Sequence, residues 1–275
     1  MYHVAPDISP AKVEAALRRI VWKNGRPHCP RCGAFRIRAV KKEGRYHCPK
    51  CRKKFSLLSH TWMKDVKIPL SLFVILLSFW LEDVTVELAS KLAGLSRPTI
   101  YRYYRLFRRH IVRSIDFVPQ NAVQVDEAYF GQFKKQANYF HGKRTYKVVQ
   151  KTCVAGIACP ETGMLATQVV ETLPGEPIKS FIRSLVPEDV TVYSDGSPIY
   201  TNLRTTHFHL AQTHDRGFET AYYIESCWSW MKRKLFKQYH HMSRKYAKEY
   251  VSELTFKYNT RGEPKNPFDY LSKSL

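Results

Sequence analysis

The chain has few acidic residues for its size. Its 275 residues include 23 Asp and Glu against 45 Lys and Arg, which gives a formal net charge of +22. Such an excess destabilises a compact fold by self-repulsion unless a polyanion relieves it. Nucleic acid is the obvious polyanion, because each neutralised phosphate releases counterions. The basic residues are spread over the whole chain, which favours a nucleic-acid-binding protein over a merely soluble basic one.

A long hydrophobic run is also absent. The longest one, residues 68–81, is shorter than the ~20 residues that a membrane span needs and is followed by Glu82 and Asp83, so we interpret it as a core helix. The N-terminal stretch MYHVAPDISPAKVEAALRRI contains no basic start followed by an apolar segment, which argues against a secretion signal. Since 44% of the residues are hydrophobic, enough for a buried core, we expect a folded cytoplasmic protein.

The cysteines do not suit a disulfide framework, because there are seven of them. Four form two Cys-x-x-Cys pairs, Cys29 with Cys32 and Cys48 with Cys51, with fifteen residues between the pairs. Each pair fits a tight turn, and two such turns complete a tetrahedral four-sulfur site for one zinc ion. A pair of redox dithiols is the alternative, but redox chemistry needs only one pair. A closed site has no open coordination position, so we expect this zinc to be structural.

Residues 67–113 have the pattern of a helical DNA-binding segment. One helix is predicted over KIPLSLFVILLSFWLEDV and a second from Thr85 to Leu92. Gly94 marks the end of the second helix, while Ser96 and Pro98 suit the start of a third. Two helices joined by a short turn that contains glycine form the helix-turn-helix pattern.

The third predicted helix carries arginines that could read DNA. Arginine can pair with phosphates or with guanine edges, and the candidates here are Arg97, Arg102 and Arg105. An ordinary basic linker helix between two domains is the alternative interpretation.

The second half of the sequence alternates strands and helices around three acidic residues. NAVQVDEAYFG is predicted as a strand carrying Asp126, and VTVYSDGSPIY as a short strand ending in Asp195. Between them lie two further strands, VVQKTCVAGIACPETG and MLATQVVE, and the helix GEPIKSFIRSLV. A fifth strand, THFHLA, precedes the helix AYYIESCWSWMKRKLFKQY, which carries Glu225, and a final helix, KYAKEYVSELTFKYN.

This order of elements is that of the ribonuclease H-like fold, an α/β fold with a mixed sheet whose first and fourth strands are neighbours. Asp126 and Asp195 should therefore converge, and a helix packed over that edge can add Glu225. Clustered carboxylates suit Mg²⁺ or Mn²⁺, and two such ions about 4 Å apart favour phosphodiester transfer. Each acid also has an ordinary interpretation, as a turn residue, a strand-edge charge or a solvated helix acid.

Two neighbours of Glu225 strengthen the catalytic interpretation. Trp228 and Lys232 follow it by three and seven residues and share its helical face. An acid, an aromatic ring and a cation on one face suit a site where metal ions meet a DNA end. The alternative is a helix with its tryptophan in the core and its lysine in water.

The chain resembles the insertion-sequence transposases of the Merlin-related DDE group, the ISXO type, whose members carry a zinc ribbon ahead of the catalytic domain. Four blocks in a specific order carry the resemblance: CPRC…CPKCRKKF followed by KIPLSLFVILL; LASKLAGLSRPTIYRYYRLFR; VDEAYFGQFKK; and YSDGSPIY with YIESCWSWMKR. It covers nearly the whole chain. One departure concerns the residues before Ile224 and Glu225: relatives often have Asn-Thr there, and this chain has Tyr222-Tyr223.

The resemblance implies that Asp126, Asp195 and Glu225 hold two catalytic Mg²⁺ or Mn²⁺ ions and that Lys232 contacts substrate DNA. Some members of the group use Asn or His as the third ligand, so His207, His209 and His214 remain alternatives to Glu225. The family's activity is to bind terminal inverted repeats, cut the DNA strands at the element ends and join the 3′ hydroxyls to target DNA. Two ends must be held together, which implies a homodimer or a larger assembly on DNA.

The predicted organisation has three segments. Residues 1–66 form an N-terminal helix and zinc ribbon, residues 67–116 a helix-turn-helix, and residues 117–275 a ribonuclease H-like catalytic domain. The resemblance also implies a prokaryotic, nucleoid-associated protein. Two other functions fit the same fold: a domesticated sequence-specific DNA-binding protein without catalysis, and a plain nuclease or resolvase.

Overall fold

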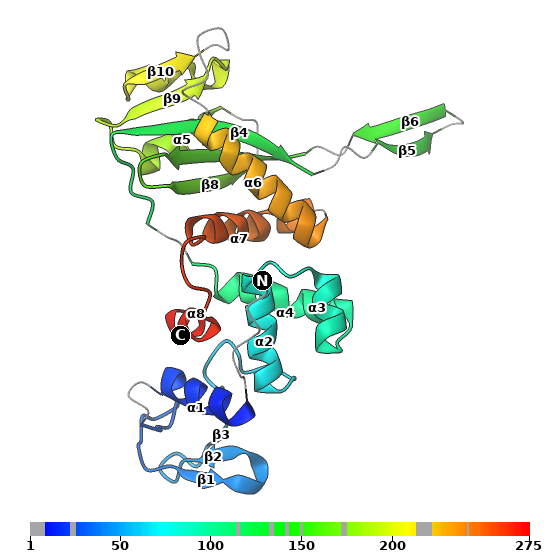
Figure 1. The fold of residues 1–275 in the computed structure, drawn as a ribbon, viewed down its shortest axis with the longest axis vertical. Coiled ribbons are helices and arrows are strands. Elements are labelled where there is room, and N and C mark those ends of the chain that lie inside the picture. The colour runs from blue at the N-terminus through cyan, green and yellow to red at the C-terminus, as the bar shows by residue number, and fades with distance from the viewer. Residues whose placement is uncertain are drawn as a thin grey trace. The chain divides into compact units, whose positions relative to one another are not determined.

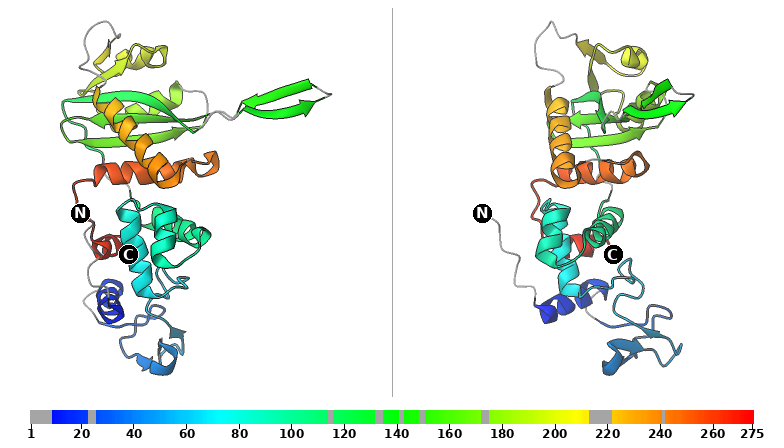
Figure 2. Two further views of the ribbon diagram at one scale, coloured as in Figure 1. Left: turned by 45° about the vertical axis from the view of Figure 1, so that its right-hand side comes forward. Right: turned by 90° about the vertical axis from the view of Figure 1, so that its right-hand side faces the viewer.

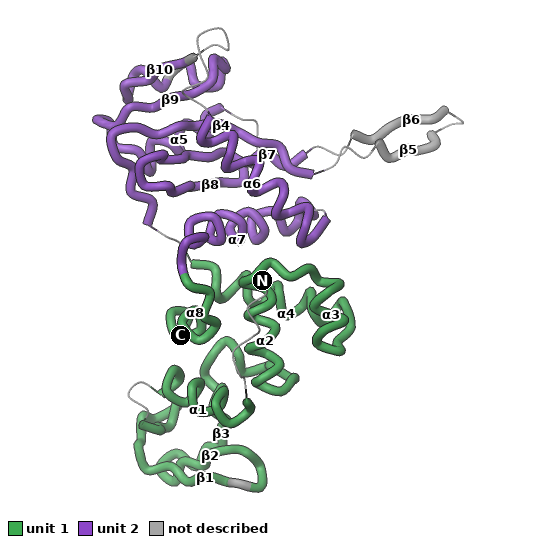
Figure 3. The backbone as a smooth tube through the Cα atoms, in the orientation of Figure 1, with its two compact units in different colours: residues 1–113, 264–275 green, residues 114–263 purple. Residues whose placement is uncertain are grey.

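The computed structural model of the chain describes residues 9–22, 26–113, 116–131, 135–140, 143–148, 151–171, 175–212, 222–240 and 242–275. These residues form two compact units: residues 1–113 together with 264–275, and residues 114–263 (Figure 3). The last helix, α8 (Pro267–Lys273), contacts α1 and α2 and thus belongs to the first unit. The Trp62 indole N–H donates to the Ser274 hydroxyl (3.2 Å), which holds this C-terminal segment there. The units therefore divide the chain differently from the three predicted segments.

The N-terminal part of the first unit is a small ribbon. Its elements are α1 (Pro10–Val21), β1 (Arg38–Val40), η2 (Lys41–Glu43), β2 (Arg45–His47) and β3 (Lys54–Phe55), with the strands in the antiparallel order β1-β2-β3. The buried core consists of Trp22, Phe55, Cys29 and Cys48. Two of its four residues are cysteines, so the ribbon has little apolar surface to bury without a metal ion.

The helical part of the first unit confirms the predicted helix-turn-helix. It contains α2 (Leu70–Leu81), α3 (Val86–Ala93) and α4 (Arg97–His110). The Thr85 hydroxyl caps α3 by accepting the N–H of Leu88 (3.2 Å), and Gly94 ends α3 in the left-handed conformation (φ 64°) that favours glycine. Within the described residues, no helix combines the length and the apolar character that crossing a membrane requires.

The second unit is built on a mixed five-stranded sheet (Figure 1). Its elements are β4 (Ala122–Phe130), β5 (Lys135–Phe140), β6 (Lys143–Val148), β7 (Thr152–Cys159), β8 (Met164–Val170), α5 (Glu176–Leu185), β9 (Thr191–Asp195), η3 (Pro198–Thr205), β10 (His209–Gln212), α6 (Tyr222–Tyr239), η4 (Arg244–Tyr246) and α7 (Ala247–Asn259). The strand order is β10-β9-β4-β7-β8, with β4, β7 and β8 antiparallel and β4, β9 and β10 parallel. The first of these strands thus lies beside the fourth, which confirms the ribonuclease H-like fold. The hairpin β5-β6 was not predicted.

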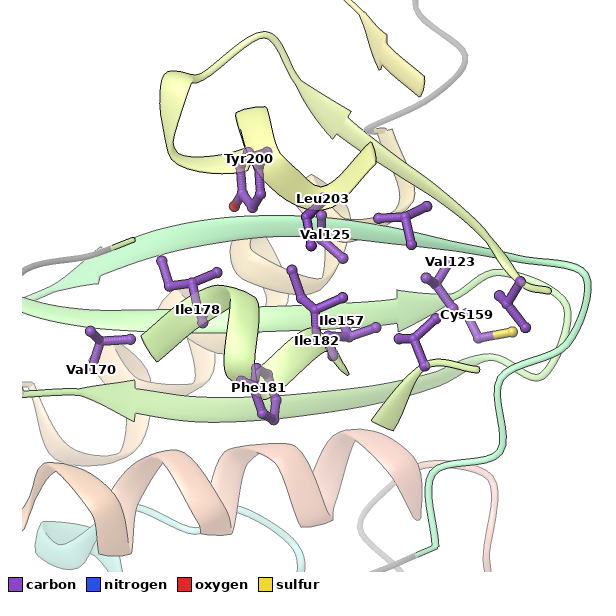
Figure 4. Close-up of a cluster of buried hydrophobic side chains, with 14 of the residues drawn as sticks. Val123, Val125, Ile157, Cys159, Val170, Ile178, Phe181, Ile182, Tyr200 and Leu203 are labelled. Atoms are coloured by element: carbon purple, nitrogen blue, oxygen red, sulfur yellow. The ribbon is translucent and has the colours of Figure 1, made fainter. Parts of the chain in front are cut away.

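The two faces of the sheet are covered by different helices, because side chains alternate along each strand. Val123 and Val125 of β4 pack into a core with α5 and η3, where Figure 4 shows Ile178, Ile182 and Tyr200 close to the strands. The opposite face is covered by α6, which contacts β4 and β7, and by α7, which contacts β8 (Figures 1 and 2).

A buried ion pair within α7 contacts α6 on that second face. The ammonium of Lys257 lies 2.7 Å from the carboxylate of Glu253, and both side chains are almost fully buried. The Tyr239 hydroxyl on α6 donates to the same carboxylate (2.8 Å), and Lys257 also donates to the Gln238 side chain (3.3 Å). These contacts place two charges in the α6-α7 interface, where removing one takes away a counter-charge 2.7 Å from the other.

We expect the Lys257→Met variant to lose about 3–5 kcal/mol of unfolding free energy, because it removes the cation that lies 2.7 Å from the buried Glu253 carboxylate. Urea unfolding of the full chain measures the loss. Lys248→Ala is the control, since its pair with Glu171 is exposed on both sides (69% and 68%) and should change stability by less than about 1 kcal/mol. Equal losses in the two variants would contradict this assignment.

Candidate active site and zinc centre

Asp126 and Asp195 lie at matching positions of adjacent parallel strands. The pairing of β4 with β9 joins Ala122 to Thr191 and Gln124 to Tyr193, with the same offset that separates Asp126 from Asp195. Asp195 is the last residue of β9, whereas Asp126 lies in the middle of β4, two residues beyond the last β4 residue that pairs with β9. This is the convergence that the strand order predicted.

The carboxyl group of Asp126 is in a position that disfavours negative charge. Burial raises its pKa from 3.8 to about 6, and the charges of Glu127 and Asp195 act in the same direction. The N–H groups of Glu127 and Trp228 oppose the shift only in part. A bound cation would relieve the repulsion between these acids.

Gln124 ties the start of α6 to the strand that carries Asp126. Its side-chain oxygen accepts the backbone N–H groups of Tyr223 and Ile224, both at 3.0 Å, and so satisfies two donors at the helix N-terminus. Glu225 follows directly in the first turn and is exposed. Gln124 was not predicted as a site residue, although a polar residue two positions before Asp126 in a strand must share its face.

The turn after β9 is fixed by hydrogen bonds around Asp195. Its Oδ1 accepts the N–H of Ser197 (3.1 Å), as in an Asx-turn. On the face of the sheet opposite α6, the buried Tyr200 hydroxyl donates to Glu127 Oε2 (2.6 Å), which links η3 to β4. Glu127 and Tyr200 were not predicted as partners, because 73 positions separate them in the sequence.

Two of the three histidines considered as alternative ligands form other contacts in the structure. His207 lies against the Val186 carbonyl (2.9 Å) and the Thr206 hydroxyl (2.9 Å), and His209 Nε2 against the Ser194 hydroxyl (2.7 Å). His214 lies outside the described residues.

The four cysteines form a tighter group than the acids do. The group consists of Cys29, Cys32, Cys48 and Cys51, whose sulfur atoms all lie within 4.8 Å of one another. Among the residues that the structure describes, no other group of three or more potential metal ligands was found. The sulfurs of Cys29 and Cys51, and of Cys32 and Cys48, lie 3.6 Å apart. A tetrahedral zinc ion with bonds of about 2.3 Å requires about 3.8 Å, so the site fits structural zinc.

The turn that carries the first cysteine pair is also suited to thiolates. Burial opposes ionisation of Cys29, but the backbone N–H groups of Cys32 and Arg31 outweigh it and lower the pKa of this thiol to about 7. Gly33 has a positive φ (70°), and its N–H donates to the Cys29 carbonyl (2.8 Å) to close the turn.

The residues predicted to contact DNA have different environments. Arg97 is exposed and paired with Glu87 (3.1 Å), Arg102 is exposed, and Arg105 is half-buried on α4. Lys232 is exposed on α6, with its ammonium 5.9 Å from the centre of the Phe130 ring. Trp228 is only 4% exposed, and its indole N–H donates to Asp126 Oδ2 at 3.0 Å. The structure thus places the Trp228 ring in the core beside Asp126.

Comparison with known proteins identifies the family. Residues 120–259, just over half of the 275, match the ISXO2-like transposase domain, and residues 9–54 match the transposase zinc-ribbon domain. The chain belongs to the ISXO2-like transposases. The predicted resemblance is therefore confirmed, and with it the zinc ribbon and the DDE-type transposase domain. No curated protein matches this transposase.

Solved structures with a similar arrangement include an integrase and a transposase. The catalytic core domain of BIV integrase is 13% identical, with a TM-score of 0.34 over 52% of this chain and 84% of that one. Mos1 transposase in its paired-end complex with the left transposon end is 14% identical, with a TM-score of 0.31 over 72% of this chain and 76% of that one.

We expect the Asp126→Asn variant of the transposase to be more stable than the wild type at pH 7–8. An acid whose pKa is raised on folding destabilises the folded state once the pH exceeds the pKa that the acid has in the unfolded chain. Above pH 6, ionisation of Asp126 should therefore lower the unfolding free energy of the wild type by up to roughly 2–3 kcal/mol. The difference in unfolding free energy between the variant and the wild type should narrow as the pH falls through 6 towards 4. Urea unfolding from pH 5 to 8, without added divalent metal, measures it. A stability difference that stays constant over this pH range would count against the raised pKa of Asp126. So would an equal pH-dependent difference in the control Asp189→Asn, whose side chain is exposed.

The transposase should bind one zinc ion per chain, and Cys48→Ser should abolish this binding. Cys48 is fully buried in the ribbon core, so loss of the metal should also unfold the ribbon. Elemental analysis of purified protein measures the zinc content. Cys153→Ser is the matched control, because Cys153 is buried outside the cluster and its replacement should leave the zinc in place. Full zinc content in Cys48→Ser would refute the site.

Proposed function

We propose that this transposase binds the terminal inverted repeats of its element, cuts a DNA strand at each end and joins the freed 3′ hydroxyls to target DNA. The observation that carries the proposal is the placement of Asp126 and Asp195 at matching positions of the adjacent parallel strands β4 and β9. Glu225 enters on α6, which Gln124 ties to β4. Carboxylate oxygens are the ligands that Mg²⁺ and Mn²⁺ prefer, and a bound cation would relieve the repulsion of Asp126 by the charges of Glu127 and Asp195.

In this proposal Asp126, Asp195 and Glu225 hold two divalent ions. Such a pair, when bound, lowers the pKa of an attacking water or hydroxyl and stabilises the leaving oxygen. The protein keeps the carboxylates in place: the Ser197 N–H holds one oxygen of Asp195. Lys232 is two helical turns beyond Glu225 and exposed, so its ammonium can contact a phosphate next to the cut strand.

DNA recognition is assigned to the first unit. Arg97, Arg102 and Arg105 lie on α4, the second helix of the helix-turn-helix, which in this motif is the helix that enters the major groove. The ribbon adds basic residues around its zinc site. Since two DNA ends must be cut and joined together, we propose that the protein acts as a dimer or a larger assembly on DNA.

Purified protein should nick and join DNA that carries its element's own ends when Mg²⁺ is present. Asp126→Ala and Asp195→Ala should each lower both activities at least about 1,000-fold while DNA binding persists in a gel-shift assay. Glu188→Ala is the control, because Glu188 is an exposed acid of the same unit, and it should retain activity.

The pattern of failure would identify the alternatives. Nicking without any joined product would favour a nuclease, and binding to the element ends without either reaction would favour a DNA-binding regulator. Either result from the wild-type protein would overturn the proposal.

A further inference from the structure

The indole of Trp228 is enclosed between Asp126 and the strands beneath α6. Its N–H donates to Asp126 Oδ2 at 3.0 Å, and its ring meets Phe130 edge-on with centroids 6.1 Å apart. The side chain comes from α6, one turn after Glu225, and is 4% exposed. One hydrogen bond therefore connects the helix that carries Glu225 to the carboxylate of Asp126.

The space for this ring depends on a glycine. Gly156 of β7 is the direct partner of Asp126 in the sheet. A Cβ atom at Gly156 would lie 2.4 Å from Cζ2 and 2.6 Å from Cη2 of Trp228, and 3.3 Å from Cδ1 of Ile224. Real Cβ contacts are not this short, so any other residue at position 156 would force the indole or the helix to move. Two separate positions, 156 and 228, are thus fitted to each other at the acid.

The hydrogen bond has a consequence for the carboxylate. With Oδ2 held by the indole, rotation of the Asp126 carboxyl group is restricted and the lone pairs that remain are presented in a fixed direction. Carboxylates that bind metals are commonly held by such outer hydrogen bonds, whose loss costs roughly 10–100-fold in metal affinity or activity. A buried indole N–H also needs an acceptor, so satisfaction of the N–H alone is the competing explanation.

We infer that Trp228 is a positioning residue, which orients the Asp126 carboxylate for a divalent metal ion, and that position 156 is glycine to admit its ring. The inference rests on the proposed function, since it takes Asp126 as a metal ligand. It replaces the predicted contact of Trp228 with DNA, because the ring is buried.

Mn²⁺ binding to the full chain tests the inference without relying on activity. Trp228→Phe keeps an aromatic ring over Gly156 but has no N–H. It should bind Mn²⁺ roughly 10–100-fold more weakly at the site that Asp126→Ala removes, with little change in melting temperature. DNA cutting by this variant should recover as Mn²⁺ is raised. Unchanged Mn²⁺ affinity, or lower activity that no metal concentration restores, would mean a merely structural role.

The indole N–H gives a spectroscopic signature. In protein with ¹⁵N-labelled tryptophan, the signal that disappears in Trp228→Phe belongs to Trp228. Substoichiometric Mn²⁺ should broaden this signal before those of the other four tryptophans, because the paramagnetic ion would be bound by the carboxylate that the indole contacts. A Trp228 signal that is among the last to broaden would overturn the inference.

Gly156→Ala provides a second variant should Trp228→Phe fail to fold. The added methyl displaces the indole, so Mn²⁺ affinity should fall as it does in Trp228→Phe, and the double variant should lose little more, since both changes break one interaction. Gly262→Ala is the matched control, because a Cβ there meets no atom within 4 Å. Fully additive losses, or equal Mn²⁺ affinity in Gly156→Ala and Gly262→Ala, would refute the coupling.

The failure of the inference and that of the proposed function can be told apart. Wild-type protein that neither binds Mn²⁺ through Asp126 nor cuts its element's ends would refute the proposed function. Wild-type protein that does both, with Trp228→Phe binding Mn²⁺ equally well, would refute only the positioning role.

Discussion

Strand β4 pairs with an antiparallel neighbour on one side and a parallel one on the other, and the rest of the second unit depends on this double pairing. The parallel partner, β9, brings Asp195 to the level of Asp126. The antiparallel partner, β7, places Gly156 directly beside Asp126. Because the register of each pair is fixed along its whole length, a slip of one residue would reverse every side chain and separate the acids.

Successive side chains of β4 organise the two faces of the sheet. Gln124 and Asp126 bind α6 through the helix N-terminus and Trp228, while Glu127 on the other face receives the hydroxyl of Tyr200. The neighbouring acids Asp126 and Glu127 thus differ in their partners: one is held by an indole N–H and the other by a buried phenol. Burial and the charge of the neighbouring Glu127 raise the pKa of Asp126, so keeping the two acids together costs fold stability unless a cation is bound. Their placement side by side favours a site that binds cations.

The two metal-related sites differ in how they are stabilised. The ribbon has a core of four buried residues with cysteine sulfurs at its centre, so its folding and its zinc binding are expected to be one process. The candidate active site stands instead on a large apolar core on one face of the sheet and, on the other, on the α6-α7 interface, where the Glu253–Lys257 pair of α7 contacts Tyr239 of α6. Its carboxylates are therefore positioned by packing before any ion arrives, which a ligand set for catalysis requires.

The sequence by itself determined the features that depend on residues near one another in the chain. Cysteine spacing predicted the zinc site, Thr85 and Gly94 the limits of α3, and the order of strands the neighbourhood of Asp126 and Asp195. Only the tertiary structure decided which residues of different elements contact each other. These contacts are the capping of α6 by Gln124, the hydrogen bond from Tyr200 to Glu127, and the packing of Trp228 against Gly156. A helical pattern places Trp228 on the same face as Glu225, but whether that face meets solvent, DNA or a strand depends on packing. The physical reason is that local patterns determine which way a side chain points from its own element. Its partner is determined by the register and spacing of elements that lie roughly 70 to 100 residues away in the sequence.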